Sequence, residues 1–140
     1  MSGVLPIRRG RASAIIQMVL VFPLLMTLGF GILEYSSFIY AKGAVQTAAR
    51  EGARAAIQSS ATNASVQATV DSVMANAGLQ GTGYTMTLSP PTMLGLPTGQ
   101  AITVTVAFNW GNLGLHPLPT GMGGISNSKS LTSTVVMHRE

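Results

Sequence analysis

Few side chains in this sequence are of the types that carry out chemistry. The two histidines are His116, in a proline-rich loop, and His138, near the end of the chain. A metal site normally needs three or more ligands at suitable spacing, and no such group is present. The four carboxylates are Glu34, Glu51, Asp71 and Glu140. Asp71 has no second carboxylate close to it in sequence, so no acid and base pair is predicted.

Motifs for nucleophilic catalysis or phosphate binding are equally weak. No Gly-x-Ser-x-Gly turn occurs, so a hydrolase nucleophile is not indicated. Residues 124–130 have some similarity to a phosphate loop, but no glycine directly precedes Lys129. This stretch also precedes a predicted strand, whereas a phosphate loop opens a helix. We therefore expect no enzyme activity, no cofactor, no metal and no small-molecule substrate.

The feature that organises the chain is an apolar run at residues 12–33, which contains no Asp, Glu, Lys or Arg. About 20 apolar residues in a helix cross a hydrocarbon core of about 30 Å, and the run is too long for an ordinary buried helix. Because lipid offers no hydrogen-bond partners, its backbone must be helical. The helical pattern continues beyond the run. We predict one helix over residues 12–57, with residues 12–41 in the membrane.

The flanks of this run predict its orientation. Arg8, Arg9 and Arg11 precede it within a basic leader at residues 1–11, so the N-terminus should stay in the cytoplasm. Aromatic residues that suit the far interface follow it, namely Tyr35, Phe38 and Tyr40. Glu34 lies there too, where water would be near enough to keep it charged. A cleaved secretory signal is the main rival, but the run exceeds the usual 7–15 residues and no clear Ala-x-Ala site follows.

Composition limits the remaining possibilities. The chain has 140 residues, of which 46% are hydrophobic and 9% charged, and its formal net charge is +4. The arginines of the leader supply most of this charge, and no basic patch interleaved with aromatics indicates nucleic-acid binding. There are no cysteines. An exported part at residues 42–140 must therefore be stabilised by its own core, the long helix or neighbouring subunits.

Beyond Tyr40 the helix carries rows of residues spaced by four, which lie on single faces. A row of small residues consists of Ala44, Ala48, Gly52 and Ala56, and a polar row of Lys42, Gln46, Arg50 and Arg54. The small row lets another backbone come close. It can pack against the sheet of its own domain or against other copies of the helix, and the two alternatives can coexist on different faces. In the second, Gly52→Leu or Ala48→Leu would impair assembly but leave membrane insertion intact.

The rest of the chain predicts an α+β fold. An apolar face at i, i+4, i+7, i+8 and i+11 indicates a second helix at residues 64–77, capped by Ser60, Thr62 or Asn63 and stopped by Gly78. Alternation predicts strands at residues 84–89, 102–108 and 130–138. Residues 90–99 and 109–127 are expected to be loops, with Trp110 packing back onto the domain. Three short strands would form a small antiparallel sheet with a helix on its apolar face.

The sequence as a whole resembles the TadE-like proteins, which are pseudopilins or minor pilins of tight-adherence (Flp-type) pilus systems in bacteria. The most specific string is Ala48-Ala49-Arg50-Glu51-Gly52-Ala53-Arg54-Ala55, and the similar segments before it are Arg8-Arg9-Gly10, the apolar run with Pro23, Phe30-Gly31-Ile32-Leu33-Glu34-Tyr35 and Tyr40-Ala41. The Thr-rich last strand, closing in Arg139-Glu140, is also similar. The resemblance implies a pilin-like fold, in which a small domain packs on a long N-terminal helix.

The resemblance also implies sites and partners. A prepilin peptidase is expected to cut near Gly10, Arg11, Ala12 and Ser13. TadE-like proteins usually carry a glutamate six residues before the proline; here that residue is Gln17, which can form hydrogen bonds but cannot pair as an ion with a new N-terminal amine. The residues expected to pack against other helices are Gln17, Pro23, Gly29, Gly31, Glu34, Ala44, Ala48, Gly52 and Ala56.

The function implied is that of a structural or assembly subunit of an adhesive Tad-type type IV pilus. Its expected location is the bacterial cytoplasmic membrane, and the pilus after assembly. Its expected partners are the membrane, other pilin or pseudopilin subunits or further copies of itself, the prepilin peptidase and the Tad assembly platform. Two alternatives stay open: a filament subunit that assembles with itself, and a membrane-tethered binding module whose loops recognise a ligand outside the cell.

Overall fold

The computed structural model of this protein describes residues 9–93, 95–114, 118, 119, 121 and 123–139, with side chains from residue 14 onward. The predicted leader up to Arg8, together with His116 and Glu140, lies outside these residues. The elements in chain order are α1 (Arg9–Ala56), α2 (Asn63–Asn76), β1 (Thr85–Ser89), β2 (Ala101–Asn109), the 3-10 helix η1 (Trp110–Leu113) and β3 (Ser130–His138). The α+β prediction is confirmed.

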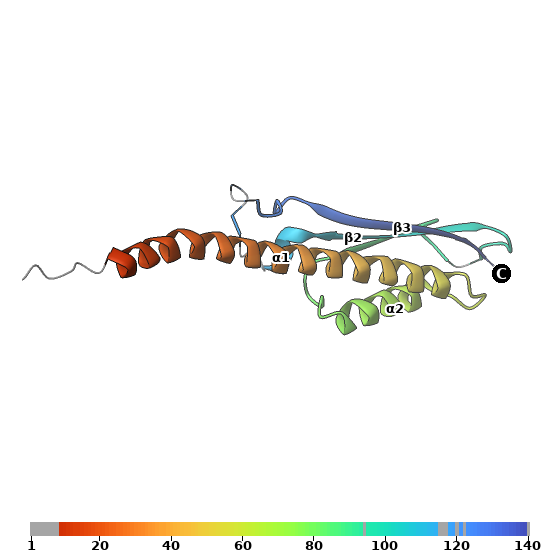
Figure 1. Cartoon of the computed structure of the whole chain (residues 1–140). Helices are drawn as coiled ribbons and strands as arrows, with labels where there is room; N and C mark the ends of the chain where they lie inside the picture. The colour runs from red at the N-terminus through yellow and green to blue at the C-terminus, as the bar shows by residue number, and fades with distance from the viewer. Residues whose placement is uncertain (1–8, 94, 115–117, 120, 122, 140) are drawn as a thin grey trace, which may run out of the picture.

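Helix α1 is long and continuous, and α2 and the sheet pack against it (Figure 1). Its first half projects away from the domain, and its second half lies along the sheet and α2. Pro23 lies within the helix, where a soluble helix would lose about 3 kcal/mol or more. The hydroxyl of Thr27 donates to the carbonyl of Pro23 at 2.8 Å, a local hydrogen bond of the kind tolerated in membrane helices.

Helix α2 begins with the side-chain cap that the sequence allowed. Of the three predicted caps, Thr62 is the N-cap of α2. Its hydroxyl accepts a hydrogen bond from the backbone N–H of Ser65, and the Ser65 hydroxyl accepts one from the backbone N–H of Thr62. The helix ends before Gly78, which has a φ of +71°. Its buried residues are Val66, Val70 and Met74, and they pack toward α1.

The three strands form one antiparallel sheet in the order β1-β2-β3. Strand β2 is central, and Ile102, Val104, Val106 and Phe108 are all buried on one face. The same register places Val106 opposite Met86 on β1 and Ser133 on β3. Because α1 contacts both β2 and β3, the buried face of the sheet lies on the second half of α1.

The predicted loop at residues 109–127 differs from expectation in one part. Trp110 opens the helix η1, capped by the side chain of Asn109, which accepts from the N–H of Gly111 at 3.1 Å. Gly111 is tightly placed, since a Cβ there would lie 2.5 Å from the carbonyl oxygen of Asn127. Trp110 is fully buried and meets Phe38 of α1 edge to face at 5.2 Å between ring centroids. The prediction that Trp110 packs onto the domain is confirmed.

Candidate functional site

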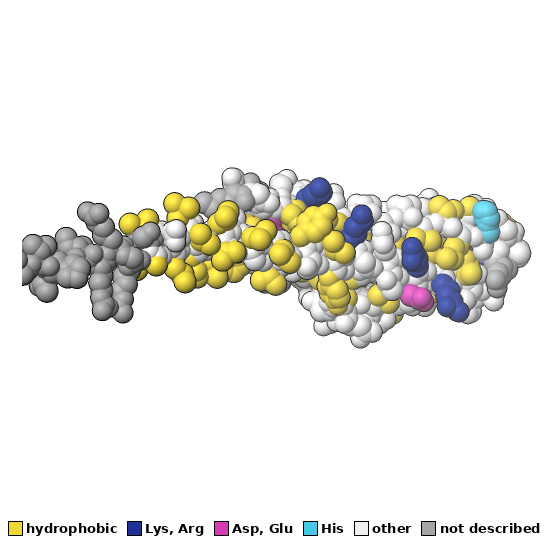
Figure 2. All heavy atoms as spheres, in the orientation of Figure 1, with side chains coloured by type: hydrophobic (Ala, Val, Ile, Leu, Met, Phe, Trp, Pro, Cys, Tyr) yellow, Lys and Arg dark blue, Asp and Glu magenta, His cyan; other side chains and the backbone are white. Residues whose placement is uncertain are grey.

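The first half of α1, as far as Phe30, is an apolar surface that its own chain leaves exposed. Its side chains from Ala14 to Phe30 are all exposed, including Leu20 at 75% and Met18 at 72%. The helix from Ala14 to Ala56 is long and apolar enough to cross a membrane, and none of its most apolar window is buried. Figure 2 shows yellow apolar side chains over the described part of this half, and the dark blue Lys and Arg side chains coloured in this view lie beyond it. So large an exposed apolar surface marks a membrane or protein contact.

Three of the residues predicted to pack against other helices lie on this uncovered half. Gln17, Pro23 and Gly29 are exposed, and a Cβ placed on Gly29 would meet nothing within 4 Å. The predicted processing residues Gly10–Ser13 belong to the first turns of α1, which begins at Arg9. The free face of Gly29 leaves room for a second helix to approach.

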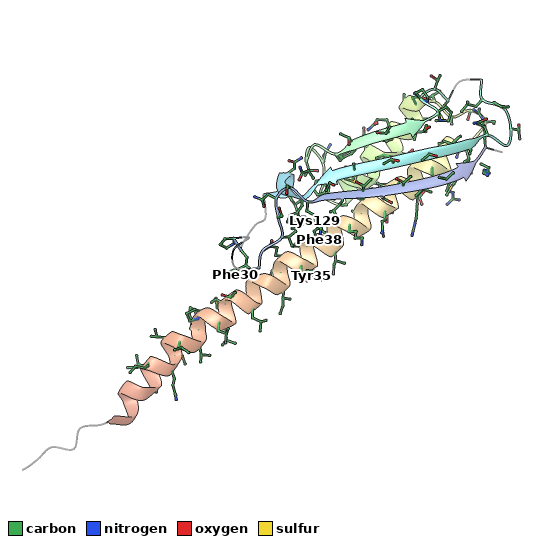
Figure 3. The ribbon with its side chains drawn as sticks, turned by 90° about the horizontal axis from the view of Figure 1, so that it is seen from above. Phe30, Tyr35, Phe38 and Lys129 are labelled. Carbon is green, nitrogen blue, oxygen red and sulfur yellow. The ribbon has the colours of Figure 1, made fainter. Side chains whose placement is uncertain are left out.

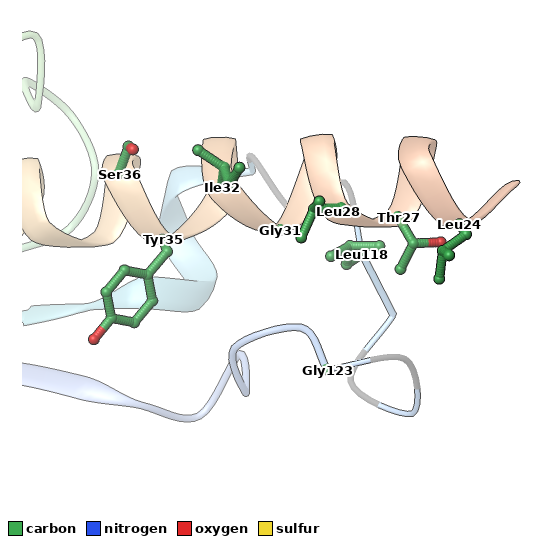
Figure 4. A pocket seen from close by; sticks show the side chains of 9 residues that line it. All are labelled: Leu24, Thr27, Leu28, Gly31, Ile32, Tyr35, Ser36, Leu118 and Gly123. Atoms are coloured by element: carbon green, nitrogen blue, oxygen red, sulfur yellow. The ribbon is translucent and has the colours of Figure 1, made fainter. Parts of the chain in front are cut away.

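Where the apolar half ends, a segment from late in the chain crosses α1. We call its described residues (Leu118, Pro119, Gly121 and Gly123–Ile125) the strap. Leu118 is mostly buried, and its Cδ1 lies 3.6 Å from the position of a Cβ on Gly31. Figure 4 shows Leu118 pointing at Gly31 between Leu24 and Tyr35. Gly31, predicted to contact another helix, therefore contacts the strap of its own chain.

Glu34 lies beneath the strap and differs from expectation. Its side chain is only 2% exposed, although the sequence suggested access to water. One carboxylate oxygen accepts a hydrogen bond from the N–H of Ile125 at 2.7 Å. The other, Oε2, is buried without a hydrogen-bond partner among the described residues. The sequence predicted that Glu34 follows the apolar run on the helix, but it could not show that residue 125 returns to cover it.

The small row packs inside the molecule. Ala48, Gly52 and Ala56 are buried and Ala44 is half-buried. A Cβ on Gly52 would lie 2.7 Å from Cγ2 of Val70 and 3.4 Å from Cγ1 of Val104, so α1 meets α2 and β2 there. Ala48 and Gly52 therefore face this chain's own core, and Gly52→Leu or Ala48→Leu would disturb folding as well as any assembly.

A polar cavity that sequence reasoning missed lies just above the strap. It has a volume of about 280 Å³ and is lined by Phe38, Lys42, Val45, Gln46 and residues 129–133 at the start of β3. Lys129 places its Nζ 5.8 Å from the centroid of the Phe38 ring, a cation–π distance. Figure 3 shows these two residues side by side at the junction of α1 and the sheet. The sequence signal was weak: Lys42 follows Phe38 and Tyr40, but Lys129 lies far along the chain with no aromatic residue near it in sequence.

Elsewhere in the described residues, the titratable side chains do not form a metal site or a catalytic site. Within the described part of the chain no group of three His, Cys, Asp or Glu could hold a metal ion. Asp71 accepts hydrogen bonds from Gln67, at 2.6 Å, and from the hydroxyl of Tyr84. Partial burial and the adjacent Asp71 carboxylate raise the pKa of Tyr84 to about 12. This cluster joins α2 to the start of β1 on the surface, which is a structural role.

Comparison with curated proteins and with solved structures gave no match. A family model did match, over residues 12–54, and its description is "TadE-like protein". The matched residues span the apolar half of α1, Glu34 and nearly all of the small row. TadE-like proteins are structural and associated with Tad pili, and membrane localisation fits both the family and the apolar helix. The resemblance to the TadE-like proteins is thus confirmed over residues 12–54, and this family implies a protein associated with a Tad pilus.

Proposed function

We propose that this protein is a pseudopilin or minor pilin of a Tad-type pilus, an assembly subunit without enzyme activity. In this proposal, the first half of α1 anchors it in the bacterial cytoplasmic membrane and the part at residues 42–140 lies outside. The observation that carries the proposal is the uncovered apolar half of α1 inside the family-matched segment. At 1.5 Å per residue, the 20 residues from Ala14 to Leu33 extend about 30 Å, one hydrocarbon core.

Orientation follows from charge. Arg8, Arg9 and Arg11 precede the apolar half, and arginines next to a membrane helix favour the cytoplasmic side. Because the chain has no cysteine, single cysteines can be placed cleanly. Thr98→Cys, exposed in the loop before β2, should react in intact spheroplasts with a maleimide that cannot cross membranes. In cells that lack the prepilin peptidase, so that the leader is kept, Ser2→Cys should react only after lysis. The reverse pattern, or release of the protein by alkaline carbonate, would refute the anchoring.

Processing by a prepilin peptidase is part of the proposal. The cut is expected within Gly10–Ser13, which would leave the apolar half at the new N-terminus. The intact mass of the protein from membranes and from sheared pili measures this directly. A mature start near Ser13 in the pilus fraction would support both cleavage and incorporation. A full-length mass confined to membranes would support a role at the assembly platform instead.

Contacts with other subunits are proposed at the uncovered half of α1, through Gln17, Pro23 and Gly29. The buried Ala48, Gly52 and Ala56 are not free to meet another chain. Gly29→Leu should reduce the amount of pili recovered by shearing while leaving membrane insertion unchanged. Gly43→Leu, at another glycine with open space around it, is the matched control. Normal pili from the Gly29 variant would exclude close helix packing at this position.

A further inference from the structure

We propose that the cavity between α1 and β3 binds the phosphate of an anionic phospholipid, with one acyl chain in the apolar groove beneath it. The inference rests on the proposed membrane anchoring. The groove has a volume of about 560 Å³ and is lined by one face of α1 from Leu24 to Ser36, together with Leu118 and Gly123 of the strap (Figure 4). Its walls are almost wholly aliphatic, apart from Thr27, Tyr35 and Ser36.

The groove and the polar cavity lie on one face of α1. Leu24, Leu28, Gly31, Tyr35, Phe38 and Lys42 line one or the other, and their spacing alternates between four and three residues. Such spacing keeps side chains on one side of a helix. The groove and the cavity therefore lie in line along this face of α1, with aliphatic residues first, then Tyr35 and Phe38, then Lys42.

The height of this face matches one leaflet of a bilayer. Tyr35 lies two residues beyond Leu33, where the apolar half ends, and Lys42 lies about 13 Å beyond Leu33 along the helix. Helical side chains lean toward the N-terminus, so Lys42 reaches back toward the membrane, and its aliphatic stem can extend along apolar surface. Lys42 can therefore reach the headgroup level, and the ammonium group of Lys129 lies 5.8 Å from the ring of Phe38, five residues beyond Leu33.

The charges favour a phosphate over a second copy of this chain. Within the described residues, the side chain of Lys42 has no hydrogen bond or ion pair, and the ammonium group of Lys129 contacts only the ring of Phe38. The apolar half of another copy, residues 14–33, offers no carboxylate at this height, and Glu34 is buried in its own chain. An anionic phospholipid supplies both an anion and an apolar chain, since its phosphate can pair with the two lysines and one of its acyl chains can fill the groove.

The experiment uses the full chain purified in a mild non-ionic detergent. Native mass spectrometry with equal amounts of phosphatidylglycerol and phosphatidylcholine, matched in acyl chains, gives the ratio of bound lipids. The wild type should retain phosphatidylglycerol in preference. A lysine near an anionic surface contributes roughly fivefold to binding. Lys42→Gln should therefore lower the preference roughly fivefold, and the Lys42→Gln/Lys129→Gln pair roughly 25-fold.

The matched control is the pair Arg50→Gln/Arg54→Gln, which removes the same charge from exposed residues about 12 and 18 Å farther along α1. Its preference should stay within about twofold of the wild type. The inference would be overturned if the wild type showed no preference for phosphatidylglycerol. It would also be overturned if the lysine pair kept this preference, or if the arginine pair lost as much of it as the lysine pair. A lipid-free complex of two chains would assign the groove to a second copy. Retention of each variant in carbonate-washed membranes tests the anchoring separately.

Discussion

The carboxylate of Glu34 accepts a hydrogen bond at 2.7 Å from the backbone N–H of Ile125, a residue 91 positions later in the chain. This bond holds the strap against α1 at the end of the apolar half, and Leu118 covers Gly31 in the next turn below. The domain thus extends along α1 as far as the end of its apolar half.

Removing this acceptor should release the strap. Glu34→Ala leaves the N–H of Ile125 without its partner, and a buried unpaired donor costs about 1–3 kcal/mol. Hydrogen exchange at Ile125 should accelerate by roughly 10- to 100-fold. Glu34→Gln keeps a carbonyl oxygen for the same bond and should preserve protection. Equal protection in all three proteins would show that the strap is held by Leu118 rather than by Glu34.

Gly52 should tolerate no side chain, because even a Cβ would lie 2.7 Å from Cγ2 of Val70. Val70 is β-branched and cannot turn aside easily. Overpacking lowers the free energy of unfolding by about 1–3 kcal/mol, whereas replacing glycine by alanine in a helix raises it by about 1 kcal/mol. Gly52→Ala should therefore lower the unfolding temperature in detergent by a few degrees, as followed by fluorescence of the single buried Trp110.

The control for Gly52 is Gly43, on the same helix with nothing within 4 Å of its Cβ position. Gly43→Ala should raise the free energy of unfolding by up to about 1 kcal/mol through helix propensity alone. If both alanine variants were stabilised, the close approach of α2 to α1 at Gly52 would be refuted.

Arg139 joins three parts of the domain at the end of β3. Its Nη1 donates to the carbonyl of Met93 and its Nη2 to that of Ser59, each at 2.8 Å. Lysine cannot form this fork, so Arg139→Lys should lose one bond and about 1 kcal/mol of stability, measured by thermal unfolding. Arg54→Lys, on the exposed face of α1, should change little. Equal effects of the two changes would contradict the role of the fork.

High pH should weaken the contact between Tyr84 and Asp71. The pKa of Tyr84 is raised from 10.0 to about 12, because partial burial and the adjacent carboxylate disfavour the tyrosinate. Between pH 10 and 12 the unfolded state therefore binds fewer protons than the folded state, and stability falls as pH rises. This contribution is complete below pH 10 and is lost by about pH 12. Tyr84→Phe should flatten the fall, as measured by denaturant midpoints across this range. An unchanged slope would show that another group is responsible.

Local patterns predicted the elements well. The alternation at Ile102, Val104 and Val106 predicted a strand buried on one face, and residues 130–138 form β3 as predicted. These patterns are local because each element repeats with its own period. The segment after Asn109 carried no period, and η1 there depends on the burial of Trp110 against Phe38, which no local rule encodes.

The sequence by itself determined the long helix, its apolar half and the α+β class, because apolar length, missing charge and periodicity act through nearest neighbours along the chain. Only the tertiary structure decided that Gly52 faces Val70, that Ile125 covers Glu34, and that Lys42 and Lys129 line one cavity. Those contacts join residues far apart in sequence, and they depend on how the loops close and the sheet docks on α1. The residues that can contact other molecules are those that stay exposed after the sheet has packed on α1.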